Sequence, residues 1–240
     1  MEHLYRVYLR SSALQQALLA LLYEAWSADL SYSGLVEVLA AAYGYVAPRR
    51  WPRAVSLARS LIGALGGATV VEPALDLANA PAQLRRAPGS AIVVDCLGLP
   101  ELYWIFKLVQ KRRLQLVVTA YVNADGKTLV FKRAFGRETM SDVARSVGGQ
   151  LFNRIDEILH TRLEQEPREL EELIREMDMR FKPVAESIAR TVAGGGAAAV
   201  AADHGYDIVK EGNLYSLSHG GRKGVNALSR LAPLLVATRA

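Results

Sequence analysis

Apolar residues recur every three or four positions along the first third of the chain, which is the spacing of one helix face. Residues 14–26 fit one such helix. A second is expected to begin after Ser31 or Ser33 and to stop at Gly44, since serine caps helix starts and glycine favours helix ends. A third follows Pro48. The opening third is therefore predicted to be helical.

A short apolar stretch at residues 66–71 then predicts a strand, so residues 1–88 have the outline of a winged-helix module. In such a module the third helix faces nucleic acid, and here it is expected to carry four arginines: Arg49, Arg50, Arg53 and Arg59. An ordinary helical subdomain with solvated arginines accounts for the same pattern.

From residue 89 onward, short apolar runs typical of buried strands alternate with helical patterns. The predicted strands are residues 91–94, 114–122, 128–135, 150–155, 197–202 and 231–237. Helices are expected from Pro100, from Thr139 and over residues 167–192. Residues 89–240 are thus predicted to form an α/β domain, a mostly parallel sheet with helices on both faces.

Acidic residues end three of these predicted strands: Asp95, Asp156 and Asp203. In open α/β sheets, ligands bind just outside the carboxyl ends of the strands. Any one aspartate after a strand is ordinary, but three at the same edge predict a site.

Three of the four histidines stand in the patterns Asp156-x-x-x-His160, Asp203-His204 and Ser218-His219-Gly220-Gly221. A histidine four residues after an aspartate lies on the same helix face, so both can hold one ion. Carboxylate oxygen and imidazole nitrogen are suitable ligands for zinc or manganese. Solvated pairs and plain turns are the alternative at each position.

The order of these motifs resembles the PglZ-type domains of the alkaline phosphatase superfamily over roughly residues 90–240. The matching segments are IVVD ending at Asp95, RIDEILH ending at His160, AVAADHG ending at Gly205 and LSHGG ending at Gly221. The tail, SHGGRKGVNALSRLAPLLVAT, is similar to the PglZ ending as well. The family has a serine or threonine nucleophile between the first aspartate and Asp-x-x-x-His.

The resemblance implies an alkaline-phosphatase-like core and two divalent metals, zinc foremost and manganese second. Asp156, His160 and His219 would hold one metal; Asp95, Asp203 and His204 would hold the other. Two such ions clamp the attacking and leaving oxygens of an in-line displacement. It also implies a covalent phosphoryl- or nucleotidyl-enzyme, and a setting in phage defence or signalling.

Three hydroxyl residues are candidates for the nucleophile. Thr139 is preferred because a helix N-terminus presents free N–H groups to a phosphate. Ser141 follows in the same turn, and Thr119 lies inside an apolar run typical of a packed strand. The spacing from Thr139 to Asp156 is short for the family. Arg222 and Lys223, next to His219, would steady a phosphate or belong to a solvated turn.

The chain carries a formal net charge of +5 with a pI near 9.4, and arginine outnumbers lysine. This balance suits anionic partners such as phosphate esters, although biased codon usage produces it equally well. The single cysteine, Cys96, cannot form an internal disulfide, and no apolar stretch is long enough to span a bilayer. A cytoplasmic protein without membrane contact is therefore expected.

The leading hypothesis is a metal-dependent phosphoesterase acting on a phosphorylated small molecule or nucleotide. The alternative is a non-catalytic nucleic-acid- or partner-binding module of a defence or regulatory system. A third interpretation is a phosphomutase or phosphotransferase that passes the phosphoryl group to an acceptor other than water.

Overall fold

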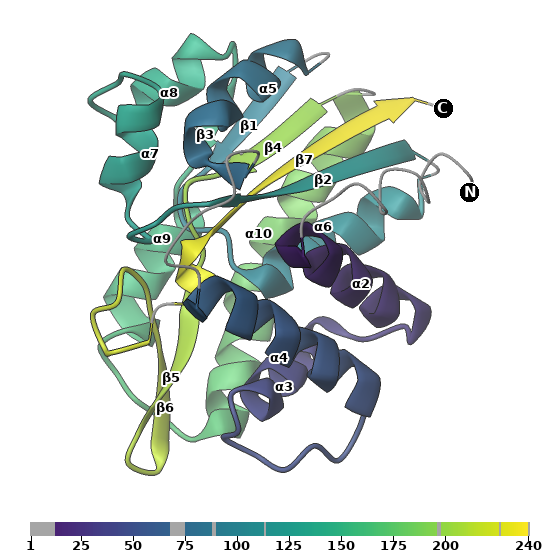
Figure 1. Cartoon of the computed structure of the whole chain (residues 1–240), viewed down its shortest axis with the longest axis vertical. Helices are drawn as coiled ribbons and strands as arrows, with labels where there is room; N and C mark the ends of the chain where they lie inside the picture. The colour runs from purple at the N-terminus through teal and green to yellow at the C-terminus, as the bar shows by residue number, and fades with distance from the viewer. Residues whose placement is uncertain are drawn as a thin grey trace.

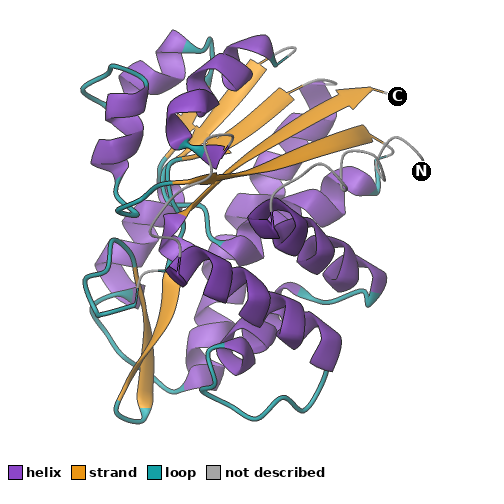
Figure 2. Ribbon diagram, in the orientation of Figure 1, coloured by secondary structure: helices purple, strands orange, loops and turns teal. Residues whose placement is uncertain are grey.

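The computed structural model describes residues 13–67, 75–87, 90–112, 114–195, 198–225 and 227–239. Over these residues the fold is α/β, with a five-stranded sheet, a separate two-stranded hairpin and helices on both faces of the sheet (Figures 1 and 2). No helix among the described residues is both long enough and apolar enough to cross a membrane.

The N-terminal helices are α2 (Ala13–Ser27), α3 (Tyr32–Ala42) and α4 (Pro52–Gly67), as the apolar spacing predicted. The Ser31 side chain caps α3 by accepting a hydrogen bond from the backbone N–H of Gly34. Helix α4 begins later than expected, so Arg49 and Arg50 lie in the loop before it. Of the strand predicted at 66–71, the first two residues end α4 and the rest lie outside the described residues.

The main sheet has the strand order β2-β7-β4-β1-β3. Its strands are β1 (Ser90–Val94), β2 (Leu114–Val122), β3 (Gln150–Phe152), β4 (Ala198–Ala202) and β7 (Leu231–Arg239). Strand β1 pairs in parallel with β3 and β4, whereas β7 pairs antiparallel with β2 and β4. The sheet is therefore mixed, not mostly parallel. The hairpin of β5 (Asp207–Glu211) and β6 (Leu214–Ser218) leaves from the end of β4, so β7 re-enters the sheet from that same end.

Alternate residues of each strand face opposite sides, and each side is covered by helices. On one side Ile92 and Val94 belong to the core that includes α2, α6 (Leu99–Gln110) and α10 (Leu170–Gly195). On the other side Ala91 and Val93 pack with α5 (Ala80–Arg86), α7 (Thr128–Ala134) and α8 (Met140–Ser146). A 3-10 turn, η2 (Leu77–Asn79), precedes α5, and another, η4 (Leu228–Arg230), precedes β7.

Two strand predictions were wrong in this region. Residues 128–134 form α7 and Phe135 ends it, because Phe131 and Phe135, four residues apart, both pack in the core on that side of the sheet. Strand β3 stops at Phe152, and Asp156 lies in α9 (Arg154–Ile158), which continues into the π-helical turn η3 (Leu159–Leu163). Asp156 therefore does not end a strand.

Candidate metal centre

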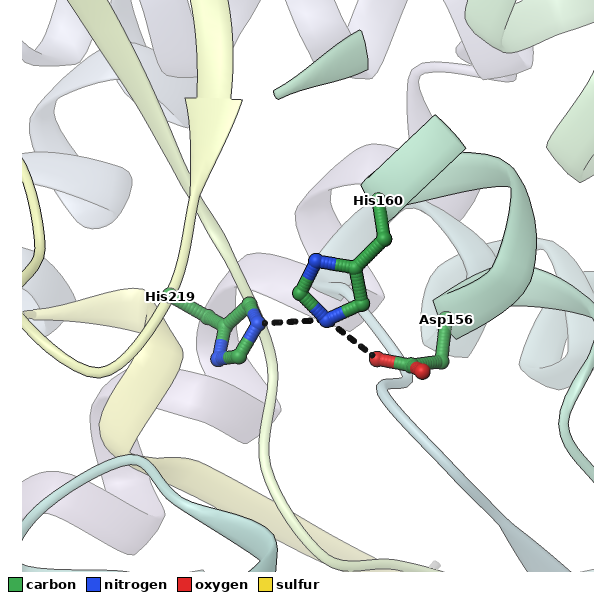
Figure 3. Close-up of side chains that lie close together, drawn as sticks. All are labelled: Asp156, His160 and His219. Atoms are coloured by element: carbon green, nitrogen blue, oxygen red, sulfur yellow. Dashed lines mark hydrogen bonds and ion pairs between the residues drawn. The ribbon is translucent and has the colours of Figure 1, made fainter. Parts of the chain in front are cut away.

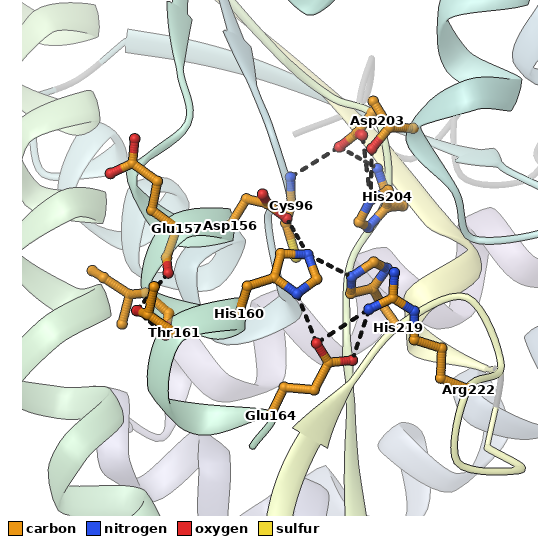
Figure 4. Close-up of polar contacts among 12 residues, drawn as sticks. Cys96, Asp156, Glu157, His160, Thr161, Glu164, Asp203, His204, His219 and Arg222 are labelled. Carbon is orange, nitrogen blue, oxygen red and sulfur yellow. Dashed lines mark hydrogen bonds and ion pairs between the residues drawn. The ribbon is translucent and has the colours of Figure 1, made fainter. Parts of the chain in front are cut away.

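The six predicted ligands gather at the end of the sheet where β1 and β4 end. Figure 4 shows five of them: Asp156, His160, Asp203, His204 and His219. Asp95 follows β1, and Asp203 and His204 follow β4, so the parallel pairing of these strands brings their ends together. Helix α9 and η3 contribute Asp156 and His160, and the loop after β6 contributes His219. The six divide into two groups of three.

The first group, called site A, consists of Asp156, His160 and His219 (Figure 3). His160 Nε2 lies 3.1 Å from Asp156 Oδ1 and 3.2 Å from His219 Nε2. Ligand atoms bound to a tetrahedral zinc at about 2.0–2.1 Å lie about 3.3 Å apart. The donor set and its spacing therefore fit a zinc-like dication.

The second group, called site B, consists of Asp95, Asp203 and His204, whose ligand atoms lie within 4.8 Å of one another. Asp203 Oδ1 accepts hydrogen bonds of 2.9 Å from the backbone N–H groups of Cys96 and His204. Its Oδ2 lies 3.3 Å from His204 Nε2, and neither this oxygen nor Asp95 Oδ1 accepts a hydrogen bond of good geometry from a described residue, although both are buried. Buried carboxylate oxygens that lack a hydrogen bond are costly, and a bound cation would satisfy both.

The two sites are in direct contact, because the ring of His204 from site B stacks on the ring of His219 from site A, with centroids 4.7 Å apart and planes 17° apart. His204 Nδ1 donates to the Gly205 carbonyl at 2.9 Å, which leaves Nε2 as the lone-pair nitrogen facing site B. The six side chains thus form one continuous centre with two binding positions.

The pKa shifts in this centre indicate an excess of buried carboxylates, which a bound cation would stabilise. Burial, together with the carboxylates of Asp203 and Asp156, raises the pKa of Asp95 to about 8. Burial also raises the pKa of Asp156. Burial and the neighbouring rings of His204 and His160 lower the pKa of His219 to about 4, which keeps its imidazole neutral, as a metal ligand must be.

The backbone around site B is held in an uncommon conformation. Cys96 has a left-handed φ of 62°, and this turns its N–H toward Asp203. Gly205 needs to be glycine because a Cβ there would stand 2.6 Å from the Leu228 carbonyl oxygen. The Asp-His-Gly motif thus combines two ligands with a close backbone approach.

None of the three predicted nucleophiles hydrogen-bonds one of the six ligands in the described part of the chain. Thr139 caps α8 and donates its hydroxyl to Asp142 Oδ2 at 2.7 Å. Ser141 is exposed on the same helix. Thr119 lies within β2 and accepts a hydrogen bond from Gln83 at 3.3 Å.

Thr128, at the start of α7, is a hydroxyl residue that the sequence reasoning missed. Its Oγ1 lies 3.2 Å from His204 Nε2, at the edge of site B. Asn123, which is fully buried, donates from Nδ2 to the carbonyls of Lys127 at 2.9 Å and Asp203 at 2.8 Å. These bonds fix the segment before Thr128 against the ligand loop. Because residues 128–135 were predicted to form a strand, nothing marked Thr128 as a helix-start residue near the ligands.

The predicted phosphate-binding residues lie beside site A. Arg222 Nη1 is 3.3 Å from both carboxylate oxygens of Glu164. Lys223 donates to the Glu164 carbonyl at 2.9 Å and to Glu211 at 2.5 Å. Both cations therefore already have partners within the chain.

The four predicted nucleic-acid-binding arginines lie around α4. Arg53 pairs with Glu24 at 3.1 Å, and Arg59 donates to the Ala41 carbonyl at 3.1 Å. The guanidinium of Arg50 lies over the Trp51 ring, 5.9 Å from its centroid, and Arg49 is exposed in the same loop.

Comparison with known proteins found no matching family model and no significantly similar curated protein.

Proposed function

We propose that the protein is a metal-dependent phosphoesterase of the PglZ type with an alkaline-phosphatase-like core. The observation that carries this proposal is the pair of adjacent ligand groups, joined by stacked histidines, with a threonine hydroxyl 3.2 Å from a ligand nitrogen. Two metal ions, zinc or manganese, would supply charge to the phosphate oxygens and lower the pKa of the attacking hydroxyl.

Thr128 is the nucleophile that this arrangement favours. It stands between Asp95 and Asp156 in sequence, as the family order requires, and farther from Asp156 than Thr139 does. In the first step, the bond between Thr128 Oγ1 and phosphorus forms while the bond from phosphorus to the leaving ester oxygen breaks, and the proton that the hydroxyl gives up ends on that leaving oxygen. Water then attacks the phosphoryl-Thr128, releases the phosphate product and restores the hydroxyl.

The substrate proposed is a phosphodiester or phosphomonoester of nucleotide type. The side chain of Lys127 lies next to Gly220, the residue after His219, since a Cβ on Gly220 would meet Lys127 Cγ at 3.2 Å. Lys132 is near enough to Asp95 to oppose the rise of its pKa. Lys127 and Lys132 thus lie near the proposed metal centre and suit an anionic substrate.

The test combines metal content with hydrolysis. Mass spectrometry of protein purified without chelator is expected to find about two zinc or manganese ions per chain, with one lost in Asp203→Ala and one in His219→Ala. Thr128→Ala is expected to lower kcat by at least about 10³-fold with metal content unchanged. Thr139→Ala, which removes the hydroxyl farther along the chain, serves as the matched control.

A protein that binds no metal even after reloading would refute the enzyme proposal. Wild-type turnover by Thr128→Ala would instead return the nucleophile to Thr139, Ser141 or Thr119. Transfer of the phosphoryl group to an added alcohol in place of water would indicate a phosphotransferase.

The alternative function, nucleic-acid binding through the N-terminal helices, is favoured by the exposed loop in which Arg50 lies over Trp51. It predicts binding to nucleic acid that weakens steeply with salt and persists in Asp203→Ala. Loss of binding in Arg49→Ala with Arg50→Ala, without any change in metal content, would support it.

A further inference from the structure

We infer that Glu164 is a positioning residue that orients His160 toward the metal of site A and joins the two segments that build this site. The inference rests on the proposed metal binding, but it concerns a side chain that no motif includes. It is carried by the hydrogen bonds around Glu164 and by its place directly after the π-helical turn η3.

The first observation is the bond between Glu164 and the far side of the His160 ring. Glu164 Oε2 lies 2.7 Å from His160 Nδ1. Nε2 also faces a carboxylate oxygen, Asp156 Oδ1, but at the longer distance of 3.1 Å. A neutral imidazole has one N–H, and the shorter bond to Glu164 places it on Nδ1. The lone pair is then on Nε2, the atom that faces Asp156 and His219. A carboxylate behind a ligating histidine fixes its tautomer and makes it a stronger ligand.

The second observation is the backbone conformation and the burial of Glu164. In η3 the backbone N–H of Glu164 bonds to the Leu159 carbonyl five residues earlier, at 2.9 Å. Turns of this wide type are rare and often occur at functional sites. The Glu164 side chain is only 10% exposed. Glutamate is seldom buried unless it is paired, which agrees with the bonds of Glu164 to His160 and Arg222.

The third observation is the contact of Glu164 with the loop that carries His219. Arg222, three residues after His219, reaches both Glu164 oxygens (Figure 4). Lys223 Nζ donates to the Glu164 carbonyl. Glu164 therefore links η3, which supplies His160, to the loop that supplies His219.

A simple surface ion pair would contribute little, since Arg222 is 57% exposed and such pairs are screened by water. The metal affinity of site A distinguishes a positioning role of Glu164 from a purely structural ion pair. An ion pair that only braces the loop leaves the tautomer of His160 free, whereas a positioning carboxylate controls it.

The experiment measures metal affinity by competition with a chromophoric chelator in the full chain. His219→Ala and Asp203→Ala first identify which binding step belongs to which site. Glu164→Ala is then expected to weaken site A by about 10- to 100-fold and to leave site B unchanged. Glu164→Gln, which keeps an oxygen acceptor for Nδ1–H, is expected to restore most of the affinity.

The matched control is Glu157→Ala, which removes an exposed carboxylate one residue from Asp156 that contacts Asn153 and Arg154 instead of a ligand. Nitrogen-15 spectra of the imidazoles supply a second readout, because the Nδ1–H tautomer of His160 should be lost in Glu164→Ala and kept in Glu157→Ala.

Wild-type affinity at both sites in Glu164→Ala would overturn the inference. Equal losses in the Ala and Gln variants and in Glu157→Ala would also overturn it, because they would indicate a general loss of structure. A wild type that binds two metals but hydrolyses no ester would refute the proposed function and leave the role of Glu164 intact.

Discussion

Asp95 makes the metal-free centre sensitive to pH. Its pKa is about 8 in the folded chain, because of burial and the nearby carboxylates of Asp203 and Asp156, and about 3.9 in an unfolded chain. Between these values the folded state holds a proton that the unfolded state releases. This contribution to the free energy of unfolding is therefore lost as the pH rises toward 8.

Other groups act at lower pH. His219, with a folded pKa of about 4, opposes Asp95 below about pH 6.5, where the unfolded chain takes up a proton that the folded ring refuses. Glu101, whose burial raises its pKa to about 7, acts in the same direction as Asp95 up to that pH. From pH 7 to 8 Asp95 dominates.

We therefore expect the chelator-treated protein to become less stable from pH 7 to pH 8, as measured by urea unfolding at fixed ionic strength. Asp95→Asn, which has no proton to lose, should abolish this slope. Adding zinc should reverse its sign, because metal binding requires the carboxylate and becomes stronger as the proton leaves. A wild-type slope that equals the Asp95→Asn slope would contradict the assignment.

At the scale of elements, β2 is an edge strand of the main sheet, and a side chain of α2 bonds its outer side. Gln15, on α2, donates from Nε2 to the Val118 carbonyl at 2.5 Å and accepts from the Ala120 N–H at 2.7 Å. It thus bonds the strand as a neighbouring strand would. Edge strands need such protection because their unpaired groups recruit other chains.

Gln15→Met keeps the side-chain volume but removes both hydrogen bonds, and Val118 and Ala120 are buried. We expect a loss of about 1–3 kcal/mol in the free energy of unfolding, together with a greater tendency to aggregate. Gln115→Met, at an exposed position of the same strand, should change stability by less than about 0.5 kcal/mol. Urea unfolding and light scattering measure both quantities, and equal behaviour of the two variants would reject the role of Gln15.

The elements that the sequence predicted correctly have strong local signals. Helices α2, α3 and α10 show long apolar periodicity, and β1, β2 and β4 are short apolar runs. Helix α7 was mistaken for a strand because seven residues are too few to distinguish the two-residue period of a strand from the 3.6-residue period of a helix. The direction of β7 depends on the path of the β5–β6 hairpin, which no local pattern contains.

In the candidate metal centre, too, local relations could be predicted and contacts between distant segments could not. Asp156 and His160 were paired correctly because four residues along a helix is a local relation. The nearness of Thr128 to His204, 76 positions later, depends on how α7 packs against the sheet. Glu164 escaped notice for a similar reason, since its link to Arg222 joins segments 58 residues apart.

At the scale of the whole molecule, the N-terminal helices and the sheet share one apolar core. Buried residues of α2, α3 and α4 belong to the same cluster as those of α6, α10 and the strands. Polar bonds cross the division predicted at residue 88. Tyr32 on α3 donates to the buried carboxylate of Glu101, which also accepts from Tyr206 at 2.8 Å. Tyr206 follows His204 by two residues, so the N-terminal helices are attached close to the candidate metal centre.

This shared core predicts that the chain unfolds as one cooperative unit, although the sequence suggested two domains. Far-UV circular dichroism and tryptophan fluorescence should give the same denaturant midpoint, and zinc should raise it equally in both, because the ion binds only the folded state. In hydrogen exchange, amides of α3 and β1 should open with similar free energies and gain similar protection from zinc. Tyr32→Phe, which removes one bond across the division, should lower both midpoints together. A separate, earlier transition in α2, α3 and α4 that zinc leaves unchanged would show instead that residues 1–88 fold on their own.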